Sequence, residues 1–392
     1  MNIILFDTSS DWQNFLPFSF TRPLAHIRIG ILTIAEKWEK LLQANISFLS
    51  EPYLQDKFKT NLQNDNLFIN SVFLPNDELI ESIKNLPNNT ILSYQNEMIA
   101  YRGITFDRNN FDKKNIQNID YQGIVNQLKS ITDIFSWNGK QIQFDFQLLT
   151  KNRTSQKITD KYTAVYKEEN IFIEEGVNIK ASILNAENGV IYLGKNSTIS
   201  EGSIIQGNFA LCEGATINPA GKMRGDTTIG PYCKVGGEIS NSVLFGYSNK
   251  GHEGFLGNSV LGEWCNLGAD TNNSNLKNNY AEVKIWNYLQ KKEINTKLQF
   301  CGLLMGDHSK AGINTMFNTG TVVGVSSNIF GADFPAKFVP SFRWGGSNSL
   351  VEYKLDKALE TANRMMERRK LKLSEEEIKI FEYILAWETN NL

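Results

Sequence analysis

The chain is short of the residues and segments that would assign it to several common classes of protein. It has four cysteines and three histidines among 392 residues, and the cysteines show no metal-ligand spacing. Lysine and arginine number 40 against 42 aspartates and glutamates, a formal net charge of −2, so no basic excess indicates a nucleic-acid partner. No apolar run is long enough for a signal peptide or a membrane span. We therefore expect a cytoplasmic protein without nucleic-acid or membrane partners.

The chain does contain a regular six-residue rhythm. An apolar residue stands at every sixth position from Leu193 to Val235, and a mostly small residue follows four positions after each. The same rhythm returns at 255–271 and 305–329. A period of six fits neither a helix nor an alternating strand, and it is typical of the hexapeptide-repeat β-helix. The unbroken series is Leu193, Ile199, Ile205, Leu211, Ile217, Met223, Ile229 and Val235.

The pattern predicts three regions. Residues 1–155 lack the rhythm and alternate strand-like with helix-like stretches, which predicts a compact α/β, Rossmann-like domain. Residues 165–345 are the expected β-helix, and residues 346–392 are expected to be helices that cap it or contact another subunit. Ser374 and Glu377 form a capping-box pattern within that last region. The other expected elements are short strands at 3–5 and 67–69 and a helix at 31–42.

The rhythm is interrupted at 236–254 and at 272–300, and each interruption is predicted to be an excursion of the chain from the solenoid. These two excursions are the places where the solenoid is expected to hold a substrate. The first contains His252, one of only three histidines, with glycines at Gly251 and Gly254. Glycine tolerates backbone conformations that carry a side chain away from a packed interior. An isolated histidine of this kind is more often a solvated loop residue than a functional one. The sequence around His252 is therefore needed to choose between these two interpretations.

Around His252 the sequence resembles a known family. It is similar to the acetyltransferase domain of the bifunctional N-acetylglucosamine-1-phosphate uridyltransferases, especially the archaeal type, and the similarity spans about residues 170–335. The elements that match at the family's spacing are His252, Phe255–Asn258, Asn266–Thr271, Asn275 and the later segment Met305–Asn314.

The resemblance implies a left-handed parallel β-helix that forms a homotrimer and binds acetyl-CoA in a groove between subunits, with Ala269 at the acetyl-CoA site. It also implies that His252 is the general base and that Asn275 assists at the same centre. The amine of an amino sugar must lose a proton as it attacks a thioester, and imidazole accepts protons near neutral pH. Lys250 is our candidate for binding the phosphate of an amino-sugar 1-phosphate.

The N-terminal region resembles the compact sugar nucleotidyltransferase-like domains that are fused to such β-helices. Its stretch Leu16–Pro23 contains a Thr-Arg pair, and Arg22 is followed by Arg28. A guanidinium group binds phosphate oxygens in a planar fork, so both arginines are predicted to bind a nucleotide or sugar phosphate, with salt bridging as the alternative. The family's G-x-G loop is missing and no magnesium ligand can be assigned, although nucleotidyl transfer would need Mg²⁺.

We therefore expect a transferase of nucleotide-sugar metabolism that acts on small molecules. The β-helix would transfer acetyl from acetyl-CoA to an amino-sugar 1-phosphate, and the N-terminal domain would transfer a nucleotidyl group from UTP or dTTP to a sugar 1-phosphate. Two alternatives stay open. One is a nucleotidyltransferase with a purely structural or regulatory β-helix, which would not bind acetyl-CoA. The other is a non-catalytic protein that senses nucleotide sugars.

Overall fold

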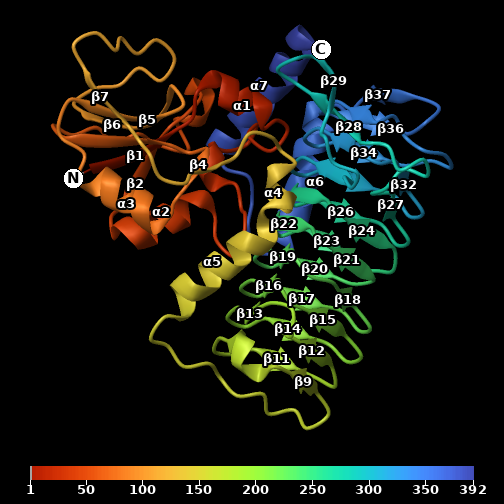
Figure 1. Ribbon diagram of the computed structural model, residues 1–392. Coiled ribbons are helices and arrows are strands. Elements are labelled where there is room, and N and C mark those ends of the chain that lie inside the picture. Colours follow the sequence, from red (N-terminus) through yellow and green to blue (C-terminus); the bar gives the residue numbers. More distant parts are fainter. Residues whose placement is uncertain (1) are drawn as a thin grey trace. The chain divides into compact units, whose positions relative to one another are not determined.

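The computed structural model describes residues 2–392, and the chain forms two compact units (Figure 1). Unit 1 contains Met1–Ile27 and Leu32–Ile131, and unit 2 contains Arg28–Ile31 and Thr132–Leu392. The sequence suggests that the first domain ends at residue 155, whereas contacts group residues 132–155 with unit 2.

Unit 1 is an α/β domain built on one mixed sheet, as its sequence pattern predicts. In order across the sheet the strands are β2 (Ile46–Leu49), β1 (Asn2–Phe6), β3 (Asn66–Asn70), β6 (Glu97–Gly103), β5 (Thr90–Tyr94) and β7 (Gln117–Asp120). The strands expected at 3–5 and 67–69 lie inside β1 and β3 and are confirmed. β1 runs parallel to its neighbours β2 and β3, while β6 is antiparallel to β3.

Three α-helices, two 3-10 helices and a small strand pair complete the described part of unit 1. The helices are α1 (Ser9–Asn14), α2 (Ile34–Leu42), α3 (Asp77–Lys84), η1 (Leu24–His26) and η2 (Pro52–Leu54), and β4 (Phe73–Leu74) pairs with β8 (Asn126–Gln127). The helix expected at 31–42 begins at Ile34 because Thr33 caps it. The Thr33 hydroxyl accepts a hydrogen bond from the backbone N–H of Glu36, and the Glu36 carboxylate accepts one from the N–H of Thr33.

Unit 2 is a parallel β-solenoid with terminal helices, as the six-residue rhythm predicts. Its first sheet contains β10 (Ile171–Ile173), β13 (Ile191–Leu193), β16 (Phe209–Leu211), β19 (Thr227–Ile229), β22 (Val243–Gly246), β25 (Val260–Glu263), β30 (Leu303–Met305), β33 (Thr321–Val323) and β35 (Phe338–Val339). The second contains β11 (Asn178–Ile179), β14 (Thr198–Ile199), β17 (Thr216–Ile217), β20 (Lys234–Val235), β23 (Asn249–Lys250), β26 (Asn266–Leu267), β31 (Lys310–Ala311), β34 (Asn328–Ile329), β36 (Arg343–Gly345) and the antiparallel β37 (Leu350–Glu352). The third contains β9 (Ala164–Tyr166), β12 (Ile183–Asn185), β15 (Ile204–Gln206), β18 (Lys222–Met223), β21 (Glu238–Ser240) and β24 (Phe255–Gly257), and β27 (Asn272–Asn273) pairs with β32 (Met316–Phe317).

Every third member of the apolar series stacks in register, so three hexapeptides make one coil. Leu193 pairs with Leu211, and Leu211 pairs with Ile229. All three side chains are fully buried in one continuous core that runs through the coils. Full burial of such a side chain contributes roughly 1.5–3 kcal/mol, so the rhythm both sets the register and stabilises the fold.

The first interruption, at 236–254, is a shortened coil of the solenoid. The prediction that the chain leaves the solenoid there is therefore wrong. Strands β21, β22 and β23 remain in the three sheets, and Val235 pairs with Lys250, fifteen residues later instead of eighteen. Lys250 therefore takes the inward position that Val235 holds in the coil before. The second predicted excursion is confirmed, because the chain leaves the solenoid after β27 and forms the antiparallel hairpin β28 (Lys284–Asn287) and β29 (Lys292–Asn295).

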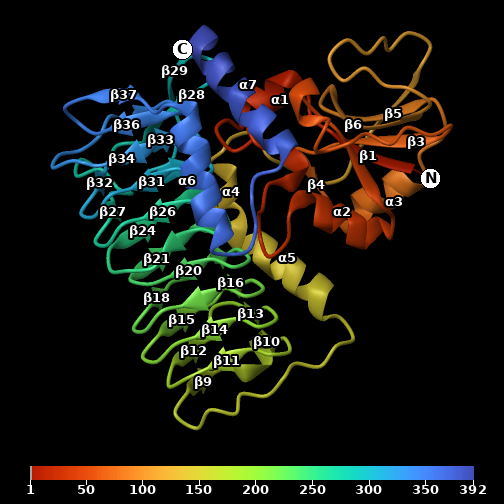
Figure 2. The same ribbon diagram turned by 180° about the vertical axis from the view of Figure 1, so that it is seen from behind.

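Unit 2 also contains the α-helices α4 (Asp133–Ser136), α5 (Asn138–Thr150), α6 (Leu355–Glu367) and α7 (Glu375–Asn391). The predicted capping box is confirmed at the start of α7, where the Ser374 hydroxyl accepts from the N–H of Glu377. Figure 2 shows α6 running alongside the coils of the solenoid. The buried Glu388 of α7 accepts a hydrogen bond of 2.7 Å from the Ser341 hydroxyl, which fixes α7 to the last coils.

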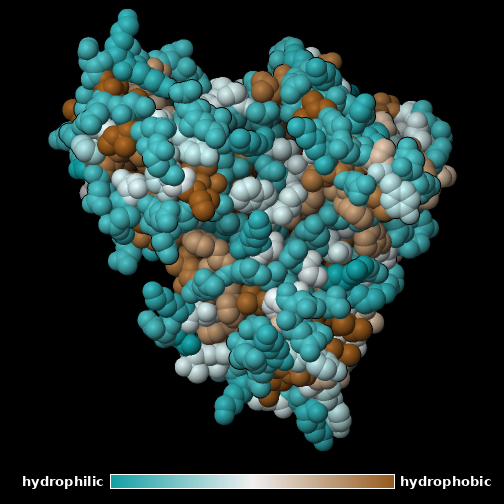
Figure 3. Space-filling view, in the orientation of Figure 1, coloured by the Kyte–Doolittle hydropathy of each residue, from teal (hydrophilic) through white to brown (hydrophobic). Residues whose placement is uncertain are grey.

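Among the helices of residues 2–392, none is both long enough and apolar enough to cross a membrane. The face in Figure 3 is mainly hydrophilic, with brown areas over the coils at the lower right. Ile183 and Ile204, two exposed apolar side chains, are register neighbours on the outer face of the third sheet. Adjacent coils therefore present apolar surface to solvent at the same place.

Candidate functional site

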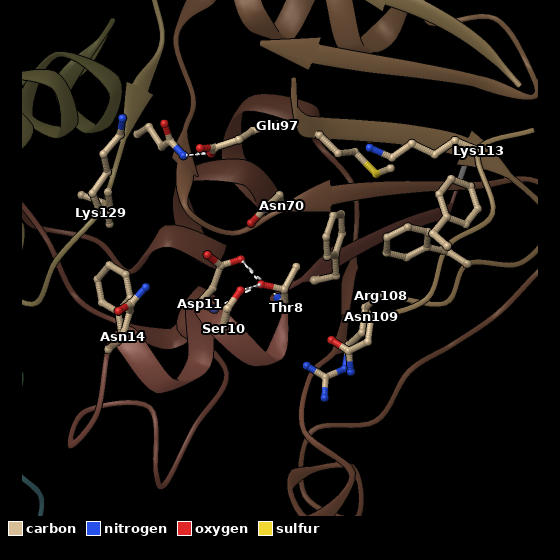
Figure 4. A pocket seen from close by; sticks show the side chains of 17 residues that line it. Thr8, Ser10, Asp11, Asn14, Asn70, Glu97, Arg108, Asn109, Lys113 and Lys129 are labelled. Atoms are coloured by element: carbon tan, nitrogen blue, oxygen red, sulfur yellow. Dashed lines mark hydrogen bonds between the residues drawn. The ribbon is translucent and has the colours of Figure 1, made fainter. Parts of the chain in front are cut away.

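Unit 1 contains a polar pocket of about 530 Å³ beyond the carboxyl ends of β1 and β3 (Figure 4). In open α/β sheets ligands bind beyond the carboxyl ends of the strands, where connections to the two sides diverge. β1 has a parallel neighbour on each side, so its carboxyl end is such a place. The polar residues that line the pocket are Thr8, Ser10, Asp11, Asn14, Asn70, Glu97, Arg108, Asn109, Lys113, Gln127 and Lys129.

Two carboxylates, Asp11 and Glu97, face this pocket. The Asp11 carboxylate accepts a hydrogen bond of 2.6 Å from the Thr8 hydroxyl, and burial, with a smaller contribution from the charge of Glu97, raises the pKa of Asp11. No cluster of three or more His, Cys, Asp or Glu side chains suited to a metal occurs within residues 2–392. Mg²⁺ commonly takes one or two carboxylates together with substrate phosphates, so this pair fits a magnesium ion shared with a nucleotide.

Three cationic side chains, Arg108, Lys113 and Lys129, line the same pocket. Arg108 is fixed by its guanidinium, which donates hydrogen bonds of 2.7 Å to the Glu51 carboxylate and 2.8 Å to the Asp7 carbonyl. Figure 4 shows Lys129 on one side of the carboxylates and Lys113 on the other. Cations and carboxylates around one polar cavity suit phosphate groups bound together with a divalent metal.

Neither arginine predicted to bind phosphate lines this pocket. Arg28 belongs to unit 2, where its Nε donates a hydrogen bond of 3.2 Å to the carbonyl of Phe245 and its guanidinium also donates to the carbonyl of Ile31. Arg22 is 6% exposed, and its guanidinium contacts the hydroxyl of Thr21 at 3.3 Å. Both side chains thus have partners within the chain, and phosphate binding by either arginine stays a prediction.

Unit 2 contains a groove of about 470 Å³ across the outer face of its second sheet. The floor is formed by Lys234, Asn249 and Asn266, which are register neighbours on β20, β23 and β26. One wall consists of Tyr247 and Trp264, whose rings stack 4.3 Å apart. The next corner of the coils and the end of α6 complete the lining, with Asn218, Gly251, His252, Leu267, Gly268, Ala269, Ile313, Met365, Arg368 and Arg369.

His252 is exposed in this groove, and two side chains hold the backbone of its loop. The Asn218 amide donates to the carbonyl of Gly251 at 2.7 Å, and Lys250 Nζ donates to the carbonyl of His252 at 2.6 Å. Lys250 is 2% exposed, and burial lowers its pKa to about 8. Gly237 leaves room for the ammonium group, since a Cβ there would lie 2.9 Å from Nζ. The histidine side chain is thus exposed while its backbone is fixed.

The structure brings two of the four residues predicted for acetyl transfer into one groove, namely His252 and Ala269. Asn275 does not line the groove, and its amide donates a hydrogen bond of 2.8 Å to the Asn258 side chain. Lys250 points into the core of the solenoid instead of into the groove. The functional roles of all four residues stay predictions.

Sequence reasoning missed most of the charged lining of both cavities. In the groove, Lys234 occupies an ordinary outward position of the repeat, and Arg368 and Arg369 follow a helix whose docking position no local pattern gives. In unit 1 the lining residues come from several separate segments, so no short motif marks them. The presence of polar residues directly after β1 was the one available signal there.

Residues 3–154 match the family model described as sugar nucleotidyl transferase. No curated protein matches this sequence.

Several solved structures of acyltransferases align with about half of this chain. One is the polySia-specific acetyltransferase NeuO, 17% identical, which covers 54% of this chain and 96% of its own with a TM-score of 0.29. Another is a point mutant of AntD, an N-acyltransferase from Bacillus cereus in complex with dTDP and coenzyme A, 15% identical, with coverage of 55% and 100% and a TM-score of 0.22. A third is UDP-N-acetylglucosamine acyltransferase from Campylobacter jejuni, 14% identical, with coverage of 57% and 95% and a TM-score of 0.19.

Proposed function

We propose that this protein is a transferase of nucleotide-sugar metabolism, with an acyl-transfer site in the groove of unit 2 and a nucleotidyl-transfer site in the pocket of unit 1. The observation that carries the first site is the exposed His252, which shares a groove with Ala269 on the face of a hexapeptide solenoid. The second site is supported by the family match of residues 3–154 and by the charged pocket at the end of β1.

In the groove, His252 acts as the general base. It takes a proton from the amine nitrogen of an amino-sugar 1-phosphate as that nitrogen forms a bond to the thioester carbonyl carbon of acetyl-CoA. The carbon–sulfur bond then breaks, and the thiolate of coenzyme A leaves and takes up a proton. A positioned base of this kind contributes roughly 10²–10⁴ in rate. Asn275 and Lys250 do not line the groove, and neither touches substrate in this reaction.

In unit 1, Arg108, Lys113 and Lys129 bind the phosphates of UTP or dTTP and of a sugar 1-phosphate. Asp11 and Glu97 would hold Mg²⁺, which neutralises phosphate charge when it is bound. Positioning and charge neutralisation are the main contributions that phosphoryl-type transfer needs from a protein, and the charged lining of this pocket is suited to both.

A homotrimer is part of the proposal. The exposed register neighbours Ile183 and Ile204 support it, because contiguous apolar surface often marks a protein interface. Light scattering after size-exclusion chromatography measures the mass directly, and a monomeric mass at working concentration would contradict a trimer.

One incubation tests both activities. The protein is mixed with glucosamine 1-phosphate, acetyl-CoA, Mg²⁺ and UTP or dTTP, each reagent is left out in turn, and products are identified by mass. We expect an N-acetylated sugar phosphate whenever acetyl-CoA is present and a nucleotide sugar whenever the nucleoside triphosphate and Mg²⁺ are present. A nucleotide sugar without acetylation would favour a nucleotidyltransferase with a structural solenoid, and no product at all would favour a sensing protein.

A further inference from the structure

We propose that the end of helix α6 supplies the phosphate-binding part of the acyl-donor site, so that the groove of unit 2 selects an acyl group carried on a phosphorylated nucleotide. The inference rests on the proposed acyl transfer at His252 and deepens it. It gives a ligand-binding role to a helix that lies outside the solenoid and that the sequence suggests is a cap or a subunit contact.

The groove of unit 2 has a positively charged lining. The described residues that line the groove include Lys234, Arg368 and Arg369, and none of the lining residues carries a carboxylate. Within residues 2–392, neither Lys234 nor Arg368 has a hydrogen-bond or ion-pair partner for its side chain, whereas Arg364 on the same helix pairs with Glu360 at 2.6 Å. Cations from two different elements that face one cavity without partners suit an anionic ligand such as phosphate.

The end of α6 is attached to the coils beside the groove. Arg369 donates a hydrogen bond of 3.0 Å to the carbonyl of Tyr232, and the ring of Tyr232 stacks on that of Tyr247 at 5.2 Å. The end of α6 is therefore fixed at the corner where β23 begins, while His252 follows the other end of β23. β23 is two residues long, and Tyr247 and His252 lie on either side of it, so phosphate and reacting carbon would bind at opposite ends of this part of the groove.

The floor of the groove also contains an unsatisfied hydrogen-bond acceptor. Asn249 lies on the floor of the groove, and its buried Oδ1 atom has no hydrogen-bond partner within the described chain. Buried polar atoms are nearly always paired, so this atom is suited to an N–H group of a ligand. The wall formed by Tyr247 and Trp264 beside it is aromatic.

Together these features specify the chemistry of the donor. Phosphates lie at the end of α6, an arm with an amide N–H crosses the floor at Asn249, and a reactive carbonyl lies at His252. Coenzyme A thioesters have these groups in this order, with a phosphorylated nucleotide at one end and a thioester at the end of an amide-containing arm. An acyl group on an arm without the nucleotide would leave the cations of α6 unused.

Calorimetry with the two halves of coenzyme A tests the assignment. The probes are coenzyme A, 3′,5′-ADP and pantetheine, each titrated into the full-length protein. We expect Arg368→Gln and Lys234→Gln each to lower the affinity for coenzyme A and for 3′,5′-ADP by about tenfold, as loss of a charged hydrogen bond does. The affinity for pantetheine should be unchanged in both variants. Asn249→Ala should lower the affinity for coenzyme A and for pantetheine and leave the affinity for 3′,5′-ADP unchanged. Arg364→Gln is the matched control, since it removes the same charge from α6 outside the groove.

Failure of this inference and failure of the proposed function give different results. Acetyl transfer by the wild type that is unaffected by Arg368→Gln at low acetyl-CoA would overturn the inference and leave the function standing. Binding of 3′,5′-ADP that depends on Arg368, without any acetyl transfer, would support the phosphate site and overturn the function. Absence of 3′,5′-ADP binding by the wild type would also overturn the inference.

Discussion

Lys250 Nζ donates a hydrogen bond of 2.6 Å to the carbonyl oxygen of His252, from inside the core of the solenoid. The lysine occupies a position that the rest of the repeat fills with apolar side chains, and Val235 is its neighbour in register. A charge at this position is costly, because burial disfavours the ionised form. The bond connects the core directly to the loop that carries the proposed base.

The first prediction concerns this bond. Lys250→Met should retain the fold, since methionine has a similar length and suits an apolar core. Acetyl transfer should fall about tenfold in kcat, because the loop of His252 loses one of the side-chain contacts that fix its backbone; such a loss corresponds to roughly 1.4 kcal/mol. Steady-state kinetics and thermal unfolding measure the two effects separately, with the exposed Lys180→Met as control. An unchanged kcat in Lys250→Met would show that the bond has no role in catalysis.

The same substitution has a pH signature. Burial lowers the pKa of Lys250 from 10.5 to about 8, so the unfolded chain holds more protons than the folded protein between these values. The contribution of Lys250 to stability therefore rises with pH across that window. The wild type should gain unfolding free energy relative to Lys250→Met between pH 8 and 10.5, measured by urea denaturation. Parallel curves would contradict the buried, titrating lysine.

A second prediction concerns the attachment of α7. Burial raises the pKa of Glu388 to about 7, although the Ser341 hydroxyl and N–H and the Tyr288 hydroxyl donate hydrogen bonds to it. The folded protein holds more protons than the unfolded chain between pH 4.5 and 7, so stability from this group is lost as pH rises through 7. Glu388→Gln should therefore raise Tm at about pH 8 and have less effect near pH 5. A uniform loss at both pH values would contradict this account.

The pocket of unit 1 gives a third prediction. Lys113 lines the pocket and its exposed neighbour Lys114 does not. Lys113→Gln should weaken UTP binding by several-fold to about tenfold through loss of a phosphate contact, while Lys114→Gln should leave it unchanged. Titration calorimetry with UTP and Mg²⁺ measures both, and equal affinities in the two variants would remove Lys113 from the nucleotide site.

Arg28 supports a fourth prediction. Its guanidinium donates to the carbonyls of Phe245 and Ile31, so Arg28→Met removes a charged donor from two buried acceptors. We expect a loss of about 2 kcal/mol of unfolding free energy, typical for hydrogen bonds from a charged group, with unchanged UTP affinity. Denaturant unfolding and calorimetry report the two quantities. A selective loss of UTP affinity would instead support the phosphate-binding role expected from the sequence.

The solenoid was predictable because its sequence period is its structural period. Leu193, Leu211 and Ile229 stack where a six-residue rhythm requires. The shortened coil was not predictable, because the loss of three residues between Val235 and Lys250 breaks the rhythm just as an outward loop would. For this reason the sequence suggests that Lys250 binds a substrate phosphate, although its side chain lies in the core.

Residues of the candidate sites were predictable from the sequence only where they belong to one continuous repeat segment. His252 and Ala269 lie in adjacent coils of one repeat, and stacking brings them to the same face. Arg368 reaches the groove from a helix about a hundred residues later in the chain, and Lys113 reaches the other pocket from a separate loop. Contacts of this kind depend on how elements pack, which local periodicity does not encode.

Acetyl transfer by wild type and His252→Ala tests the central claim most directly. Glucosamine 1-phosphate and acetyl-CoA are the substrates, and thermal unfolding and coenzyme A affinity are measured alongside. The account predicts an N-acetylated product from the wild type and a rate lower by roughly 10²–10⁴ in the variant, with unchanged Tm and coenzyme A affinity. An equal rate in the variant would contradict His252 as the base, and no product from the wild type would contradict the acyl-transfer site itself.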